Sequence, residues 1–158
     1  MSSDRVLLEV RNLTVDYVGD NSIARAVDGI DFDIREGEAF GLAGESGCGK
    51  STVAFALARL TRLPGLVSGG QVRLNGEDVL TFDKARLKAY RWREVSFVFQ
   101  SAMNALNPVI PISEQLIDVM ETHEPGLSKE EARKRAIDLF DLVGIPSARL
   151  DEFAHQFS

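Results

Sequence analysis

The sequence is short of several features that commonly point to a function. Among its 158 residues it has a single cysteine, Cys48, so no disulfide can form within the chain. It has no apolar run long enough to cross a bilayer, and its opening residues, MSSDR, do not resemble a signal peptide. Internal repeats, low-complexity tracts and a sustained heptad pattern are also missing. Together these absences predict a globular protein of the cytoplasm.

Positive charge is scarce as well. The 24 acidic residues outnumber the 18 basic ones, which gives a net charge of -6 and a pI near 5.0. Such a balance disfavours broad attraction to nucleic acid or to anionic lipid. The hydrophobic content of 44% is sufficient for one domain with a core. One stretch is locally basic, and we expect a solvated helix face there rather than a membrane or partner site; its cations are Lys84, Arg86, Lys88, Arg91 and Arg93.

The most informative segment reads GESGCGKS, begins at Gly44 and matches the phosphate-binding pattern G-x-x-x-x-G-K-[ST]. Its glycines, which include Gly47 and Gly49, permit backbone angles that let successive N–H groups surround phosphate oxygens. Lys50 can reach the β- and γ-phosphates, and the Ser51 hydroxyl can coordinate Mg²⁺. The pattern therefore predicts a site for a nucleoside triphosphate with Mg²⁺, the alternative being an ordinary glycine-rich surface loop.

The residues around this loop have the alternation of strand and helix that the motif requires. An apolar run at 39–43 predicts a buried strand before it, and residues 52–60 predict a helix after it. Ser128 and Glu131 form a capping box for a later helix, and Ser113 is expected to cap another. The other expected elements are strands at 6–10, 13–17, 30–34, 71–74 and 95–99, a turn at Asn75-Gly76, and helices at 83–92, 113–123 and from 128 to the stop signals Gly144 and Pro146.

An apolar stripe lies at helical spacing in the last of these helices, and we expect it to pack in a core without any cofactor. Its members are Ala132, Ala136, Leu139, Phe140 and Val143.

In this order, the features resemble the nucleotide-binding domain of ATP-binding cassette (ABC) transporters, an α/β fold of the P-loop NTPase type, and the resemblance covers essentially the whole chain. Tyr17 stands where the family has an aromatic residue that stacks on adenine, although ordinary packing is the alternative for a strand tyrosine. Gln100 matches the Q-loop glutamine, which implies contact with Mg²⁺ or the attacking water. The segment from Phe99 to Pro108 looks like the dipeptide, oligopeptide and nickel importer branch.

The resemblance implies a site, a division of the chain and a set of partners. Residues 1–107 correspond to a β-rich subdomain with the Walker A and Q-loop part of the ATP-binding core, and residues 108–158 to part of a helical subdomain. Implied partners are transmembrane permease subunits on the inner face of the cell membrane and a second nucleotide-binding domain, but no nucleic acid. Mg²⁺ would be held by Ser51 and Gln100, and ATP by Tyr17, Gly44, Glu45, Ser46, Gly47, Cys48, Gly49, Lys50, Ser51 and Thr52.

The last residues resemble the approach to the signature L-S-G-G-Q, with Phe157 and Ser158 in its first two places. The Walker B segment, the catalytic glutamate and the switch histidine of the family have no match in the chain. We therefore expect these residues to bind nucleotide but to hydrolyse ATP poorly. Because the family places strands from beyond the signature beside the strand at 39–43, we also expect self-association or a distorted core.

Other classes of protein stay open at this point. A nucleotide kinase or small GTPase carries the same loop, but it does not explain Tyr17, Gln100 and Phe157 together. The N-terminal lobe of a DNA-repair or chromosome-maintenance ATPase is a closer alternative, which the acidic charge disfavours. A non-catalytic assembly module is the third.

Overall fold

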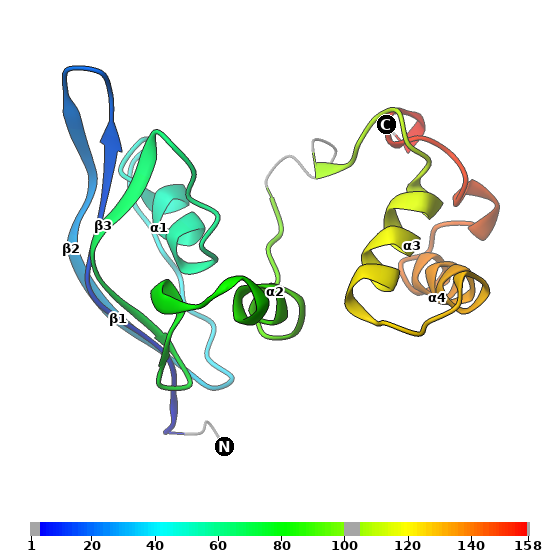
Figure 1. Ribbon diagram of the computed structural model, residues 1–158, viewed down its shortest axis with the longest axis horizontal. Helices are drawn as coiled ribbons and strands as arrows, with labels where there is room; N and C mark the ends of the chain where they lie inside the picture. Colours follow the sequence, from blue (N-terminus) through cyan, green and yellow to red (C-terminus); the bar gives the residue numbers. More distant parts are fainter. Residues whose placement is uncertain (1–3, 100–104, 158) are drawn as a thin grey trace. The chain divides into compact units, whose positions relative to one another are not determined.

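The computed structural model describes residues 4–99 and 105–157 (Figure 1). These residues divide into two compact units, Met1–Ser96 and Phe97–Ser158. The first unit combines a sheet with two helices, whereas the second is helical. This distribution agrees with the α/β class and with the helical second half expected from the sequence.

A four-stranded antiparallel sheet forms the larger part of the first unit (Figure 1). Strand β1 (Val6–Val18) lies between β2 (Ile23–Arg35) and β3 (Gly65–Leu74), and β4 (Glu77–Asp78) follows β3 through the tight turn at Asn75-Gly76. The sequence predicts two separate strands where β1 is one. Its register shifts near Asn12, whose φ of 47° lets the strand bend without ending.

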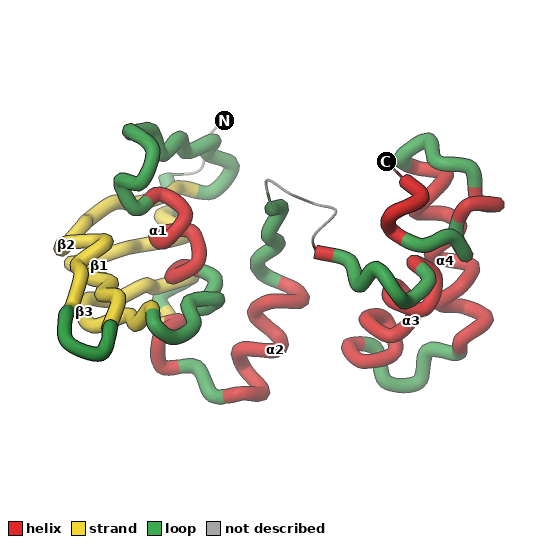
Figure 2. Tube along the Cα trace, turned by 90° about the horizontal axis from the view of Figure 1, so that it is seen from above, coloured by secondary structure: helices red, strands yellow, loops and turns green. Residues whose placement is uncertain are grey.

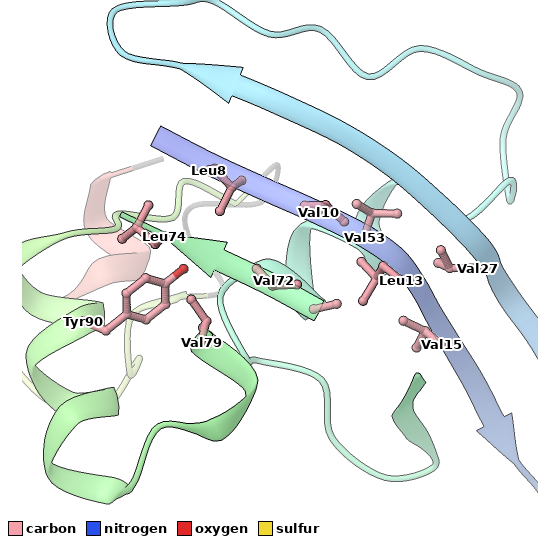
Figure 3. Close-up of a cluster of buried hydrophobic side chains, with 11 residues drawn as sticks. Leu8, Val10, Leu13, Val15, Val27, Val53, Val72, Leu74, Val79 and Tyr90 are labelled. Carbon is pink, nitrogen blue, oxygen red and sulfur yellow. The ribbon is translucent and has the colours of Figure 1, made fainter. Parts of the chain in front are cut away.

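One face of the sheet carries the core. Val10, Leu13 and Val15 of β1 are completely buried, and Val72 of β3 joins them (Figure 3). Helix α1 (Lys50–Leu57) covers part of this face with Val53 and Ala56. The core thus fixes the position of the helix that directly follows the phosphate loop.

A second helix, α2 (Lys84–Arg93), adds Tyr90 to the same core. It follows the short 3-10 helix η1 (Val79–Thr81), and the carboxylate of Asp83 caps it by accepting a hydrogen bond of 2.7 Å from the N–H of Arg86. The helix predicted at 83–92 is therefore confirmed, and the structure adds that Asp83 is its capping residue.

The second unit is built on α3 (Ile112–His123) and α4 (Lys129–Leu142) (Figure 2). The capping box of Ser128 and Glu131 is present at the start of α4, as predicted. The short helices η3 (Ser147–Arg149) and η4 (Ala154–Phe157) follow. A small core joins these elements through Ile112, Ala136, Phe140 and Leu150.

Two local expectations in the second unit are wrong. Ser113 does not cap α3, because Pro111 occupies the capping position and Ser113 is buried within the first turn. Only part of the apolar stripe of α4 is buried: Ala132, Ala136 and Phe140 are buried, whereas Leu139 and Val143 are exposed. The stripe is wider than the surface that α3 and the short helices cover.

The two buried strands expected beside the phosphate loop and before Gln100 are absent from the described residues. Residues 39–43 form no regular element, and Phe40 and Leu42 are 41% and 44% exposed. Residues 95–99 are equally irregular, with Val98 90% exposed. An apolar run becomes a strand only when other strands supply hydrogen-bonding partners. Both edges of β1 are already paired with β2 and β3, so the described sheet offers these runs no central position.

Within the ranges 4–99 and 105–157, none of the helices combines the length and the apolar character needed to span a membrane.

Candidate functional site

The glycine-rich loop from Gly44 to Gly49 connects the irregular run at 39–43 to the start of α1. Gly47 and Gly49 have φ of 83° and 93°, in the left-handed region that favours glycine. The loop is exposed to solvent along most of its length. A ligand can therefore reach it directly, and the first turn of α1 adds the positive end of a helix dipole.

Two of the glycines lie where an added side chain would force neighbouring atoms to shift. A Cβ atom on Gly49 would lie 2.5 Å from the carbonyl oxygen of Ala26 in β2. A Cβ atom on Gly44 would lie 2.7 Å from the sulfur of Cys48. The first distance shows that the end of the loop packs against β2, and the second shows that the two ends of the loop lie close together.

The Lys50 ammonium lies over the loop rather than in solvent away from it. Its Nζ donates to the carbonyl oxygens of Gly44 at 2.8 Å and Glu45 at 2.5 Å, and lies 3.4 Å from the sulfur of Cys48. These are exchangeable partners at the surface, so phosphate oxygens can replace them and gain a charge-assisted hydrogen bond. The geometry gives the loop a local positive charge in a protein that is acidic as a whole.

The first turn of α1 places two hydroxyl groups differently. Ser51 is exposed beside the loop, where a hydroxyl is available to a metal ion or a phosphate. Thr52 is buried, and its Oγ1 lies 3.4 Å from the hydroxyl of Tyr17. The two predicted nucleotide-binding segments, 35 residues apart in the chain, are thus adjacent.

The Tyr17 ring is neither free nor packed in the core. It borders the first residue of β3, since a Cβ atom on Gly65 would lie 3.3 Å from its Cε1, and 37% of the residue is exposed. The ring thus packs beside Gly65, as the alternative of ordinary packing for a strand tyrosine requires, but part of the residue stays exposed. A partly exposed aromatic residue next to the first turn of α1 is suited to stacking on a planar base.

Not every predicted site residue can be placed. Gln100 and Ser158 lie outside the described residues. Glu45, Ser46 and Cys48 are exposed residues of the loop. The structure therefore brings together Tyr17, the loop and Thr52.

The basic face of α2 is largely exposed, as expected: Lys84, Lys88, Arg91 and Arg93 are exposed, and only Arg86 is partly buried. Arg86 pairs with Glu77 and Glu94 and lies 4.2 Å from the centre of the Phe82 ring. Hydrogen bonds to Glu94 and Glu77 raise the pKa of Arg86.

Two further residues of α2 contact the end of α1, and the sequence had not marked them as functional. The buried hydroxyl of Tyr90 donates to the carbonyl of Leu57 at 2.8 Å, and Arg91 Nε donates to that of Ala58 at 3.1 Å. Burial raises the pKa of Tyr90 to about 12, and burial together with Arg59 and Arg62 lowers the pKa of Arg91. No local pattern could have identified these contacts, because their acceptors are backbone carbonyls more than 30 residues earlier.

Comparison with known proteins identifies the family of the chain. A family model described as ABC transporter matches residues 27–158. Similar proteins include a putative peptide import ATP-binding protein of Brucella abortus, 45% identical over 96% of this chain and 46% of its own length. The oligopeptide transport ATP-binding protein OppD of Salmonella typhimurium is 38% identical, over 97% of this chain and 46% of its own length. The chain thus spans about half the length of the curated relatives that it matches.

Solved structures lead to the same fold. A bacterial ABC transporter cassette, solved as a dimer, superimposes with a TM-score of 0.80 at 26% identity, over 96% of this chain and 63% of its own. The same values apply to a cassette in a post-hydrolysis state bound to ADP and Pi. The phosphate loop, the adjacent aromatic residue and the matched family agree, and the chain belongs to the ABC transporter family.

Proposed function

We propose that this chain is the nucleotide-binding part of an ATP-binding subunit that energises peptide import. The observation that carries the proposal is the loop from Gly44 to Ser51, with the Lys50 ammonium held over its carbonyls by hydrogen bonds of 2.8 and 2.5 Å. Relatives at 45% and 38% identity are named as ATP-binding proteins of peptide import and oligopeptide transport. These names favour peptides over nickel as the transported solute.

ATP would contact residues from two segments of the first unit. Tyr17 would stack on the adenine, and the loop would surround the phosphates together with Thr52, whose Oγ1 lies 3.4 Å from the Tyr17 hydroxyl. The loop residues in this role are Gly44, Glu45, Ser46, Gly47, Cys48, Gly49, Lys50 and Ser51. Mg²⁺ would neutralise phosphate charge, with Ser51 and Gln100 as its protein ligands.

ATP hydrolysis is proposed for the whole protein, in which Gln100 would contact the metal ion or the attacking water. For the 158 residues themselves we propose binding with little turnover. Phosphoryl transfer needs a placed metal ion, a placed water and compensating charge, and Lys50 and Ser51 supply the binding part of that set.

The proposed partners are transmembrane permease subunits and a second nucleotide-binding domain, which would place the protein on the inner face of the membrane. A dimeric cassette among the similar structures supports the second partner. The subdomain division at residues 107 and 108 also remains a proposal, beside the compact units that meet at Ser96 and Phe97.

Equilibrium ATP binding tests the proposal. The wild-type chain, Lys50→Ala and the control Lys134→Ala, which changes an exposed lysine of α4, are titrated with ATP in the presence and absence of Mg²⁺. We expect saturable binding that Mg²⁺ strengthens, a loss of about tenfold or more for Lys50→Ala, and no loss for the control. Absence of saturable binding to the wild-type chain would refute the proposal.

A further inference from the structure

Helix α1, which follows the phosphate loop, ends on a residue in an unusual conformation. Arg59 has φ of 50°, in the left-handed region that glycine normally occupies at helix ends. Its N–H donates to the carbonyl of Ala56 at 3.0 Å, and the N–H of Leu60 donates to that of Phe55 at 2.7 Å. These two bonds form the Schellman arrangement and satisfy two carbonyls of the last turn. The three carbonyls that follow must find other donors.

Side chains of α2 supply those donors. The Tyr90 hydroxyl donates to the carbonyl of Leu57 at 2.8 Å. Arg91 donates from Nε to the carbonyl of Ala58 at 3.1 Å and from Nη2 to the carbonyl of Arg59. Three consecutive carbonyls at the end of α1 are thus held by two adjacent residues of another helix.

The Arg59 side chain, at the end of α1, donates hydrogen bonds in turn to the segment before α2. Its Nη1 donates to the carbonyls of Phe82 at 2.6 Å and Val79 at 3.3 Å, in the segment just before α2. These bonds offset the unfavourable left-handed backbone of an arginine. Tyr90 is only 2% exposed and lies in the core (Figure 3), and its ring packs edge to face with that of Phe82, with centroids 5.6 Å apart. The two helices are therefore connected from both sides.

The length of α1 makes this connection relevant to the phosphate loop. The helix has eight residues, so about two turns separate Lys50 from the bonds at its far end. A helix this short is not stable alone, and its orientation depends on tertiary contacts. Its first residue carries the ammonium group of the site, and its N-terminal Gly49 has no side-chain cap.

We propose that Tyr90 and Arg91 are positioning residues for nucleotide binding, and we name the pair the α2 clamp. By holding the end of α1, the clamp sets Lys50 and Ser51 relative to the loop, so that both meet the phosphates of ATP. The inference rests on the proposed nucleotide-binding function and deepens it, because it assigns a role in that site to residues that do not touch the ligand.

Four variants of the 158-residue chain test the clamp. Tyr90→Phe removes only the hydroxyl and keeps the ring against Phe82. Arg91→Met removes both donors at similar length, and Arg91→Lys restores a single, compact donor. Arg93→Met changes an exposed arginine of the same helix and is the matched control. Binding is measured at a temperature at which circular dichroism shows every variant to be folded. If Arg91→Met does not fold, Arg91→Lys is used in its place.

The readouts are the dissociation constants of MgATP and of inorganic tripolyphosphate, with hydrogen exchange of the α1 amides measured without nucleotide. We expect Tyr90→Phe and Arg91→Met to weaken both ligands by about three- to tenfold, Arg91→Lys to lie between, and the control to stay within about twofold. A merely structural role would lower the melting temperature and leave the affinities of the folded chain unchanged.

The outcomes separate the two proposals. If the wild-type chain binds MgATP and both clamp variants bind it within about twofold of wild type, the positioning role is wrong, whatever the exchange rates show. If the wild-type chain binds neither ligand, the proposed function is wrong. In that case, hydrogen exchange alone tests whether the α2 clamp holds the end of α1. Faster exchange of the α1 amides in both variants supports this hold, and unchanged exchange overturns it.

Discussion

The hydroxyl of Tyr17, near the end of β1, lies 3.4 Å from the hydroxyl of Thr52 in the first turn of α1. The distance is long for a hydrogen bond between hydroxyls, and the ring also borders Gly65. The contact nevertheless orients the ring beside the phosphate loop and leaves 37% of the residue exposed. The base and phosphate portions of a nucleotide can thus be held by two segments in direct contact.

Replacing Tyr17 separates the role of its ring from that of its hydroxyl. We expect Tyr17→Leu to weaken ATP binding by about fivefold or more, because a stacking surface worth about 1 kcal/mol or more is lost. Tyr17→Phe keeps that surface and should change the dissociation constant by less than about twofold. Titration with ATP by calorimetry measures both.

Inorganic tripolyphosphate is the control ligand for these variants, since it has phosphates but no base. Its affinity should be the same for the wild-type chain and for Tyr17→Leu. Equal losses for ATP and tripolyphosphate would show that Tyr17 supports the loop rather than the base.

The two left-handed glycines of the loop should respond differently to alanine. Gly47→Ala meets no atom within 4 Å and should cost about 1 kcal/mol through its backbone angle alone. Gly49→Ala also places its Cβ 2.5 Å from the Ala26 carbonyl, and we expect about 2–4 kcal/mol of lost stability. Urea unfolding of both variants measures the difference. Equal losses would mean that the contact with β2 does not constrain the loop.

Burial of Tyr90 predicts a loss of stability at high pH. Its pKa is raised from 10.0 to about 12, so the folded chain keeps the hydroxyl proton where the unfolded chain has lost it. The resulting stability is fully present below pH 10 and is lost as pH rises towards 12. Between these limits, the free energy of unfolding of the wild-type chain should fall by about 2 kcal/mol more than that of Tyr90→Phe.

Tyr90→Phe serves here as the control for all other groups that titrate in this range. Parallel pH profiles for the two proteins would contradict the assignment of the shift to Tyr90.

In the second unit, an ion pair predicts acid sensitivity. Asp151 accepts hydrogen bonds of 2.9 and 2.6 Å from Arg133, and this pairing, with Ser113, lowers the pKa of the carboxyl from 3.8 to about 2. A depressed pKa contributes stability that is present above pH 3.8 and is lost as pH falls towards 2. Asp151→Asn should therefore lower the melting temperature at neutral pH, and the gap from wild type should narrow on acidification.

Asp138→Asn removes an exposed carboxylate of α4 and is the matched control. A gap for Asp151→Asn that stays constant down to pH 2 would show that the lost stability is not electrostatic.

Patterns within a few neighbouring residues predicted their elements well. The turn at Asn75-Gly76 joins β3 to β4, and the capping box of Ser128 and Glu131 starts α4. The strands expected at 39–43 and 95–99 are not formed, because an apolar run does not specify which strands will pair with it. Leu139 is exposed for a similar reason: helical spacing identifies one face but not how much of it a neighbour covers.

By itself, the sequence determined the chemistry of the phosphate loop. The eight residues from Gly44 to Ser51 are contiguous, and the backbone freedom, the ammonium group and the hydroxyl that bind phosphates come from their identities. Only the tertiary structure decided what surrounds that loop. The contact of Tyr17 with Thr52 and the hold of Tyr90 on the Leu57 carbonyl each join residues more than 30 positions apart. Such contacts arise from the packing of the sheet and the two helices on one core, which no local pattern encodes.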